Sequence, residues 1–131
     1  MWARFSEKFL GPAALVLARW LCRFFLRVEV QGDLLPLKAK GGLLLIANHC
    51  SYLDGVILRL FLSPDLLFTV DTQVAQRPFF KWVVKQVRRV EIESQNPFAL
   101  RGLAKTITES EEKVVFFPEG RLSVHGSLMK V

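Results

Sequence analysis

A histidine and an aspartate lie five residues apart in the segment NHCSYLD, residues 48–54, and together they could perform acid–base chemistry. A histidine can take a proton from a hydroxyl group, and an aspartate that holds one ring nitrogen leaves the other nitrogen free as the base. Residues five apart in one regular helix point about 140° apart and cannot touch. For the two side chains to meet, His49 must lie outside the helix that carries Asp54.

A structural role for Asp54 is the alternative interpretation. Ser51 precedes Asp54 by three residues, just before an apolar helical run. This spacing fits a capping box, in which Ser51 is the N-cap and the carboxylate of Asp54 reaches back to the Ser51 amide. The two interpretations are compatible, because an N-cap at Ser51 leaves His49 in the preceding loop. We expect both the cap and a His49–Asp54 dyad in which His49 is the catalytic base.

A second polar cluster, PEGRLSVHG at residues 118–126, follows another apolar run and contains Glu119 and Arg121. In open α/β sheets, ligands bind at the carboxyl ends of the strands. If the strands that precede the two clusters are parallel neighbours, then His49, Asp54, Glu119 and Arg121 converge on one crevice. That crevice is the predicted site.

The segments around these clusters alternate between strand-like and helix-like patterns. Strands apolar on both faces, separated by helices, predict an α/β sheet with at least some parallel pairing. We expect Asn96 to cap a helix and Pro78 to lie in a first helical turn. The predicted strands are residues 28–33 (strand and turn), 42–48, 66–70, 90–92 and 113–117, and the predicted helices are 53–62, 77–90 and 97–107.

The N-terminal segment, residues 1–27, has the pattern of an amphipathic helix that lies on a membrane. Arg19, Arg23 and Arg27 recur every four residues and form a basic row opposite aromatic and aliphatic residues, including Trp20 and Phe24. Such a row is costly at a bilayer centre but favourable at the headgroups. We expect an interfacial helix. The alternative is a helix that packs on its own domain.

Composition sets the broad class of the protein. Its 131 residues suit one domain, and a net charge of +6 favours an anionic membrane surface or nucleic acid as partner. The basic residues lie beside Phe and Trp, and no nucleic-acid motif is present, so we expect no nucleic-acid partner. Two cysteines, Cys22 and Cys50, predict a reducing compartment and no metal site.

NHCSYLD resembles the N-H-x4-D block of the glycerolipid acyltransferases, and VVFFPEGR resembles their F-P-E-G block, in the same order and about 70 residues apart. The wider pattern, from about residue 20, is similar to the acyltransferase part of bifunctional bacterial enzymes that also carry an acyl-acyl carrier protein synthetase domain. The resemblance implies an α/β fold with a mixed sheet flanked by helices. It also implies that residues 28–131 are the N-terminal part of an acyltransferase domain that continues past the F-P-E-G block. A synthetase domain could follow it.

The resemblance also implies a reaction. His49 would be the general base and Asp54 its orienting partner, while Glu119, Gly120, Arg121 and Ser123 would hold the glycerophosphate. A lysophospholipid hydroxyl, that of 2-acylglycerophosphoethanolamine in particular, would attack a thioester of acyl carrier protein or coenzyme A, in phospholipid synthesis or repair. No cofactor is implied beyond the acyl donor. The expected location is the cytoplasmic face of the bacterial inner membrane.

A different class of function stays open at this point. The chain could be an inactive fragment or a membrane-surface lipid-binding module, whose basic helices bind anionic lipid while the two motifs do no chemistry.

Overall fold

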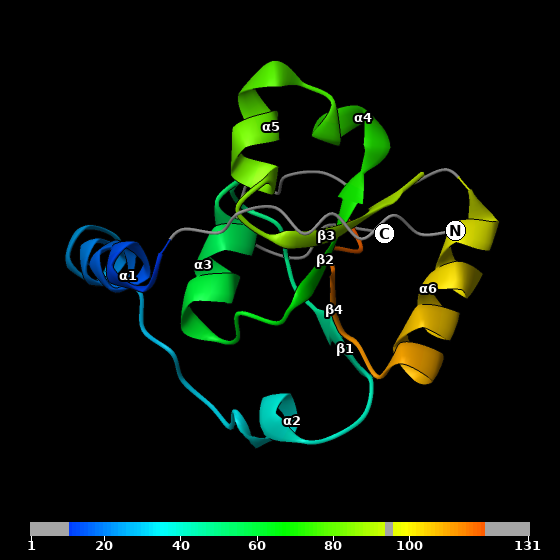
Figure 1. The fold of residues 1–131 in the computed structure, drawn as a ribbon, viewed down its shortest axis with the longest axis horizontal. Coiled ribbons are helices and arrows are strands. Elements are labelled where there is room, and N and C mark those ends of the chain that lie inside the picture. Colours follow the sequence, from blue (N-terminus) through cyan, green and yellow to red (C-terminus); the bar gives the residue numbers. More distant parts are fainter. Residues whose placement is uncertain (1–10, 94–95, 120–131) are drawn as a thin grey trace.

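A computed structural model describes residues 11–93 and 96–119 of the chain, which form a parallel sheet flanked by helices (Figure 1). Helices and strands alternate through most of this part of the chain. The elements are α1 (Pro12–Leu26), α2 (Leu35–Lys38), β1 (Leu43–Ile46), α3 (Asp54–Phe61), β2 (Leu67–Asp71), α4 (Thr72–Ala75), α5 (Pro78–Val84), β3 (Arg88–Ile92), α6 (Pro97–Ser110) and β4 (Lys113–Phe116).

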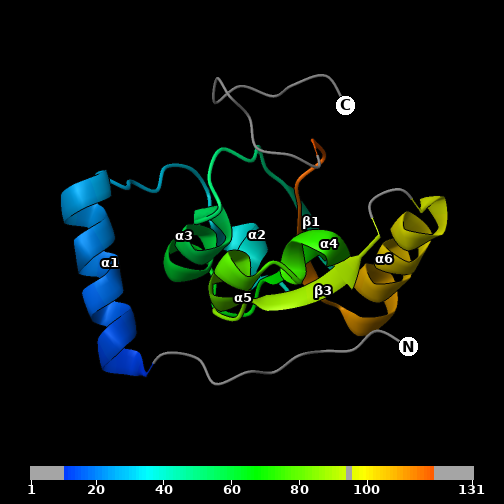
Figure 2. The ribbon, with the colours of Figure 1, turned by 90° about the horizontal axis from the view of Figure 1, so that it is seen from above.

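The four described strands pair in the order β1-β4-β2-β3, and every pairing is parallel. The expectation of a mixed sheet is therefore wrong for the described strands. Helix α6 covers one face of the sheet and α3 covers the other (Figures 1 and 2). Helices on both faces explain why β1, β2 and β4 are mostly apolar and do not alternate between apolar and polar residues.

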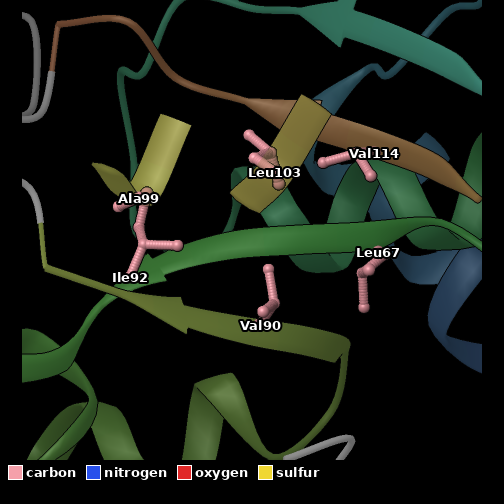
Figure 3. Close-up of a cluster of buried hydrophobic side chains, with 6 residues drawn as sticks. All are labelled: Leu67, Val90, Ile92, Ala99, Leu103 and Val114. Carbon is pink, nitrogen blue, oxygen red and sulfur yellow. The ribbon is translucent and has the colours of Figure 1, made fainter. Parts of the chain in front are cut away.

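Alternating strand residues build one apolar cluster on each face of the sheet. On β2, Leu67 points toward α6, while its neighbour Phe68 belongs to the cluster on the α3 side. Both are buried, as expected for consecutive residues of a central strand. The cluster on the α6 side, shown in Figure 3, comprises Leu67, Val90, Ile92, Ala99, Leu103 and Val114. The cluster on the α3 side is built on Leu66, Phe68, Val87 and Val115.

Strand β1 forms one edge of the described sheet, and its two faces are covered unequally. Leu45 packs into the cluster on the α3 side, whereas Leu44 and Ile46 are exposed. Gly42, just before β1, lies tight against α6, because a Cβ atom placed on it would be 2.0 Å from the carbonyl oxygen of Ile107. Contact with α6 thus reaches the beginning of β1 but leaves the outer residues of the strand uncovered.

Helix α1 begins at Pro12 and packs beside α3 (Figures 1 and 2). Its basic residues make the contact: Arg19 donates a hydrogen bond from Nε to the carbonyl oxygen of Leu60, and the guanidinium of Arg23 lies 5.7 Å from the ring centre of Phe61. These contacts agree with the alternative expectation, a helix that packs on its own domain, and association of α1 with a membrane stays a prediction. The apolar residues of α1 are instead exposed, namely Val16, Leu17, Trp20, Leu21, Phe24, Phe25 and Leu26. No helix in the described part of the chain combines the length and hydropathy needed to cross a bilayer.

Several local predictions can be compared with the structure. The side chain of Asn96 caps α6 by accepting a hydrogen bond from the Phe98 amide at 2.9 Å, and α5 begins at Pro78, as predicted. The predicted strand at residues 28–33 is not formed, and these residues are an irregular connection between α1 and α2. The short helices α2 and α4 were not predicted, since four residues are too few to show a helical period.

Candidate active site

The side chains of His49 and Asp54 meet directly. His49 Nδ1 lies 3.0 Å from Asp54 Oδ2, and the same oxygen accepts hydrogen bonds from the amides of Cys50 at 2.7 Å and Ser51 at 2.9 Å. His49 lies in the loop after β1 and Asp54 is the first residue of α3. The loop therefore folds back over the start of the helix, as the spacing predicted.

The cap of α3 differs from the predicted box. The helix begins at Asp54 with Leu53 at the N-cap position, and Leu53 contributes no side-chain cap. Ser51 lies one turn earlier, and its hydroxyl oxygen accepts a hydrogen bond from the Leu53 amide at 3.1 Å. Ser51 as N-cap was thus wrong, although its amide does bind the Asp54 carboxylate. The physical reason is that residues 51–54 form a separate turn, closed by the Asp54 amide on the Ser51 carbonyl oxygen.

The contact with Asp54 selects the protonation pattern of the histidine ring. An ionised carboxylate only accepts hydrogen bonds, so a neutral His49 donates from Nδ1 and keeps a lone pair on Nε2. Among the described residues, no hydrogen-bond partner occupies Nε2. The ring is held in place by Phe117, whose centre lies 4.4 Å away, and by Tyr52 at 6.4 Å in an edge-on arrangement. The result is an oriented imidazole with one basic nitrogen available.

The register of β1 and β4 brings the two polar clusters to the same end of the sheet. Ile46 pairs with Phe116 in adjacent parallel strands, so His49 and Glu119 each lie three residues beyond a matched pair. The Ala47 amide continues the pairing by donating to the Phe116 carbonyl oxygen at 3.1 Å. The prediction that the two strands are parallel neighbours is confirmed.

The second cluster is described only as far as Glu119. Both carboxylate oxygens of Glu119 are buried, and no described residue gives either of them a hydrogen bond. Burial of a carboxylate without hydrogen-bond donors is costly, so the carboxylate of Glu119 requires a group that donates a hydrogen bond to it. Gly120, Arg121 and Ser123, which were predicted to hold the glycerophosphate, lie outside the described residues. The described structure thus brings His49 and Asp54 together and leaves the convergence with Arg121 as a prediction.

A cavity of about 560 Å³ lies beside the dyad, and His49 is part of its wall. A volume of this size is typical of small-molecule sites, which are mostly apolar with a few polar groups. The polar wall residues are His49, Thr69, Asp71, Glu93 and Asn96. The apolar wall consists of Tyr52, Gly55, Val56, Phe68, Val70, Val74, Phe80, Val83, Val84, Val87, Ile92, Ala99, Leu100, Phe116, Phe117 and Pro118.

This cavity was not predicted from the sequence, although one signal of it was present. Phe80, Val83, Val84 and Val87 have a helical spacing in the sequence, which places them on one apolar face. In the structure all four line the cavity, while a helix packed directly on the sheet would bury that face completely. The apolar face of these four residues could be predicted from their spacing. The cavity could not, because its volume depends on how closely α5 packs on the sheet.

The chemistry of the site follows from its lining. An apolar cavity accepts a hydrocarbon chain, and the dyad at its wall can remove a proton from a hydroxyl group. Within residues 11–93 and 96–119, no three His, Cys, Asp or Glu side chains gather in a way that could hold a metal ion.

Comparison with known proteins places the chain in a family. No solved structure matches the chain. Residues 27–131, which include both motifs and the whole described sheet, match the model of the Acyltransferase family. The chain therefore belongs to the Acyltransferase family, whose members transfer acyl groups.

Proposed function

We propose that this protein moves a fatty acyl group from a thioester to the free hydroxyl of a lysophospholipid. The acyl donor is acyl carrier protein or coenzyme A, and 2-acylglycerophosphoethanolamine is the first acceptor to test. The observation that carries the proposal is the 3.0 Å contact between His49 Nδ1 and Asp54 Oδ2 at the wall of an apolar cavity. The contact supplies a base, and the cavity supplies space for a fatty chain.

The reaction needs one base and no covalent enzyme intermediate. Nε2 of His49 takes the proton of the acceptor hydroxyl while the hydroxyl oxygen attacks the thioester carbonyl carbon. The new carbon–oxygen bond forms, the carbon–sulfur bond breaks, and the proton passes from His49 to the departing sulfur. Asp54 stabilises the imidazolium that exists between these two transfers. General-base catalysis of this kind contributes roughly 10²- to 10⁴-fold in rate.

The polar end of the acceptor belongs to the second cluster in this proposal. Arg121 suits a phosphate because its guanidinium can donate two parallel hydrogen bonds. Glu119, Gly120 and Ser123 are adjacent in the sequence and complete the proposed glycerophosphate site. A glycerophosphate at the carboxyl ends of β1 and β4 would place its ester-forming hydroxyl near His49, since both clusters leave the sheet there.

Membrane association at the cytoplasmic face of the bacterial inner membrane is part of the same proposal. The exposed face of α1 carries Trp20, Phe24 and Phe25, and the Trp20 and Phe24 rings stack at 5.6 Å. Aromatic side chains of this kind favour the boundary between headgroups and acyl chains. With Arg19 and Arg23 bound to α3, the aromatic residues provide the attraction to lipid. A lipid-binding module without turnover would use the same face.

An acyl-transfer assay on the whole chain tests the proposal and separates it from the alternative. We mix the protein with lysophosphatidylethanolamine and either acyl-acyl carrier protein or acyl-coenzyme A, and we measure diacyl product. Wild type should form product with at least one donor, and His49→Ala should lose roughly 10²- to 10⁴-fold of the rate. Lys105→Ala, an exposed change on α6, serves as the control.

Two results would contradict the catalytic proposal. Near-normal turnover by His49→Ala would remove His49 from the reaction. Vesicle binding by the wild type without turnover with either donor would favour the lipid-binding module.

A further inference from the structure

The outer surface of α5 carries two large aromatic side chains that contact little of the protein. Phe79 is 77% exposed and Trp82, one turn later, is 66% exposed. Burial of aromatic surface is among the larger favourable contributions in folding and binding, so two such neighbours mark an interaction surface. No role for Phe79 or Trp82 was predicted from the sequence.

The opposite face of α5 lines the cavity. Phe80, Val83 and Val84 are all part of the cavity wall. Helix α5 is therefore apolar on both sides, and it separates the cavity from the surroundings of the protein. A helix with apolar residues on its outer side as well as its inner side is expected where a second apolar medium meets the protein.

A row of aromatic rings connects the outer surface with the dyad. The ring of Phe79 contacts Phe80 at 5.3 Å between centres, and Phe80 contacts Tyr52 at 3.9 Å. Tyr52 in turn lies 6.4 Å from the His49 ring. Tyr52 is partly exposed and also lines the cavity, so the row passes the point where the cavity meets the surface.

Charge identifies the kind of surface that α5 fits. Arg77 and Lys81 lie next to the two exposed aromatic residues, are exposed themselves, and form no ion pair with any described residue. Aromatic rings between basic side chains match an anionic bilayer, in which the rings enter the interface and the cations meet phosphate groups. An acidic carrier protein would satisfy the cations, but it would leave two adjacent rings without an apolar medium to enter.

We propose that the outer face of α5, formed by Phe79 and Trp82 with Arg77 and Lys81, docks on an anionic lipid bilayer, and that the lipid acceptor passes from the bilayer along the rings of Phe80 and Tyr52 to His49. The route rests on the proposed function, because it requires a lipid acceptor. The docking surface itself requires only the exposed residues of α5. It is distinct from the apolar face of α1.

Vesicle cosedimentation of the whole chain tests the docking surface. The variant Phe79→Ser/Trp82→Ser should bind vesicles of phosphatidylethanolamine and phosphatidylglycerol roughly tenfold more weakly than wild type. Leu35→Ser, which changes a residue that is 69% exposed on α2, should bind normally, because α2 and α5 lie at opposite ends of the molecule in Figure 1. Circular dichroism and thermal unfolding check that each variant folds.

A charge variant tests the second element of the surface. Arg77→Gln/Lys81→Gln should weaken binding to anionic vesicles and leave binding to phosphatidylcholine vesicles unchanged, and high salt should reproduce its effect on the wild type. Normal vesicle binding by the aromatic variant would overturn the proposal. Normal vesicle binding combined with lost binding to acyl carrier protein would assign the surface to the carrier.

The activity assay separates the route from the proposed function. With lysophosphatidylethanolamine in vesicles, the aromatic variant should lose most of its turnover, whereas with the same acceptor in detergent micelles it should keep the wild-type rate. Equal loss in both would overturn the route. If the wild type has no turnover in either form while vesicle binding still depends on Phe79 and Trp82, the proposed function and the route fail and the docking surface stands.

Discussion

Arg19 of α1 donates a hydrogen bond from its guanidinium Nε to the carbonyl oxygen of Leu60, near the end of α3. Together with the Arg23 guanidinium over the ring of Phe61, this contact fixes the orientation of α1 about its own axis. Arg19 and Arg23 contact α3, while Trp20 and Phe24 are exposed. The two arginines thus hold α1 on the domain.

The first prediction concerns this attachment. Arg19→Gln/Arg23→Gln removes one hydrogen bond to a carbonyl oxygen and one cation–π contact, together worth about 1–2 kcal/mol. The docking of α1 on α3 should weaken by that amount, and amide hydrogen exchange over residues 12–26 should become faster. Arg27→Gln changes the neighbouring basic residue, for which no contact with α3 is seen, and should leave exchange unchanged. Equal exchange in all three proteins would show that the arginine contacts do not hold the helix.

The second prediction separates the dyad from the turn before α3. Asp54→Asn removes the charge that orients His49 and stabilises its protonated form, so acyl transfer should fall by roughly 10²- to 10⁴-fold. The free energy of unfolding should fall by about 1–2 kcal/mol, because three donors lose a charged acceptor. Ser51→Ala removes only the hydroxyl cap on Leu53 and should cost about 0.5–1 kcal/mol of stability. Turnover and urea unfolding measure the two effects. A larger loss of activity in Ser51→Ala than in Asp54→Asn would contradict the assigned roles.

The third prediction concerns the close packing of Gly42 on α6. A methyl group at this position would clash with the Ile107 carbonyl oxygen, 2.0 Å from the ideal Cβ position. Gly42→Ala should therefore destabilise the fold by about 1–3 kcal/mol, as overpacking usually does. Gly11→Ala is the matched control, since no atom lies within 4 Å of its ideal Cβ. Thermal unfolding of the two variants should differ, and equal midpoints would mean that α6 can move away from β1 without cost.

The fourth prediction concerns the size of the cavity and rests on the proposed function. Gly55 lines the cavity, and a Cβ atom there would lie 3.6 Å from Cδ1 of Phe68, which is an ordinary contact. Gly55→Ala should therefore be tolerated. Gly55→Leu should project further into the space that a fatty chain would occupy, and turnover should fall more for long acyl chains than for short ones. An unchanged preference for chain length would show that the acyl chain lies elsewhere.

The strands and the dyad were predictable because their determinants are local. Apolar runs bounded by polar residues located β1, β2 and β4, and the five-residue spacing of His49 and Asp54 required the loop that the structure contains. The same local signals located Asn96 as the cap of α6. Each of these features depends on residues within about one turn of each other, so neighbouring side chains determine it.

The features that were missed depend on tertiary structure. The periodicity of Arg19 and Arg23 gives their common face correctly, but it does not state whether that face meets solvent, lipid or α3. The strand order β1-β4-β2-β3 and its parallel pairing also join residues that are distant in the sequence. Hydrophobic patterns describe which residues share a face, and only packing decides what that face contacts.

The pairing of β1 with β4 also affects how the protein folds. Leu43 and Lys113 are register partners about 70 residues apart in the sequence, whereas β2 and β3 are separated by about 20. Closing the longer segment costs more chain entropy, and folding slows as such non-local contacts accumulate. His49 can meet Asp54 early, because their contact is local, but Phe117 reaches the imidazole ring only when β4 enters the sheet. The final support of the base is thus acquired in a late folding step, and the onset of activity during refolding would report completion of the sheet.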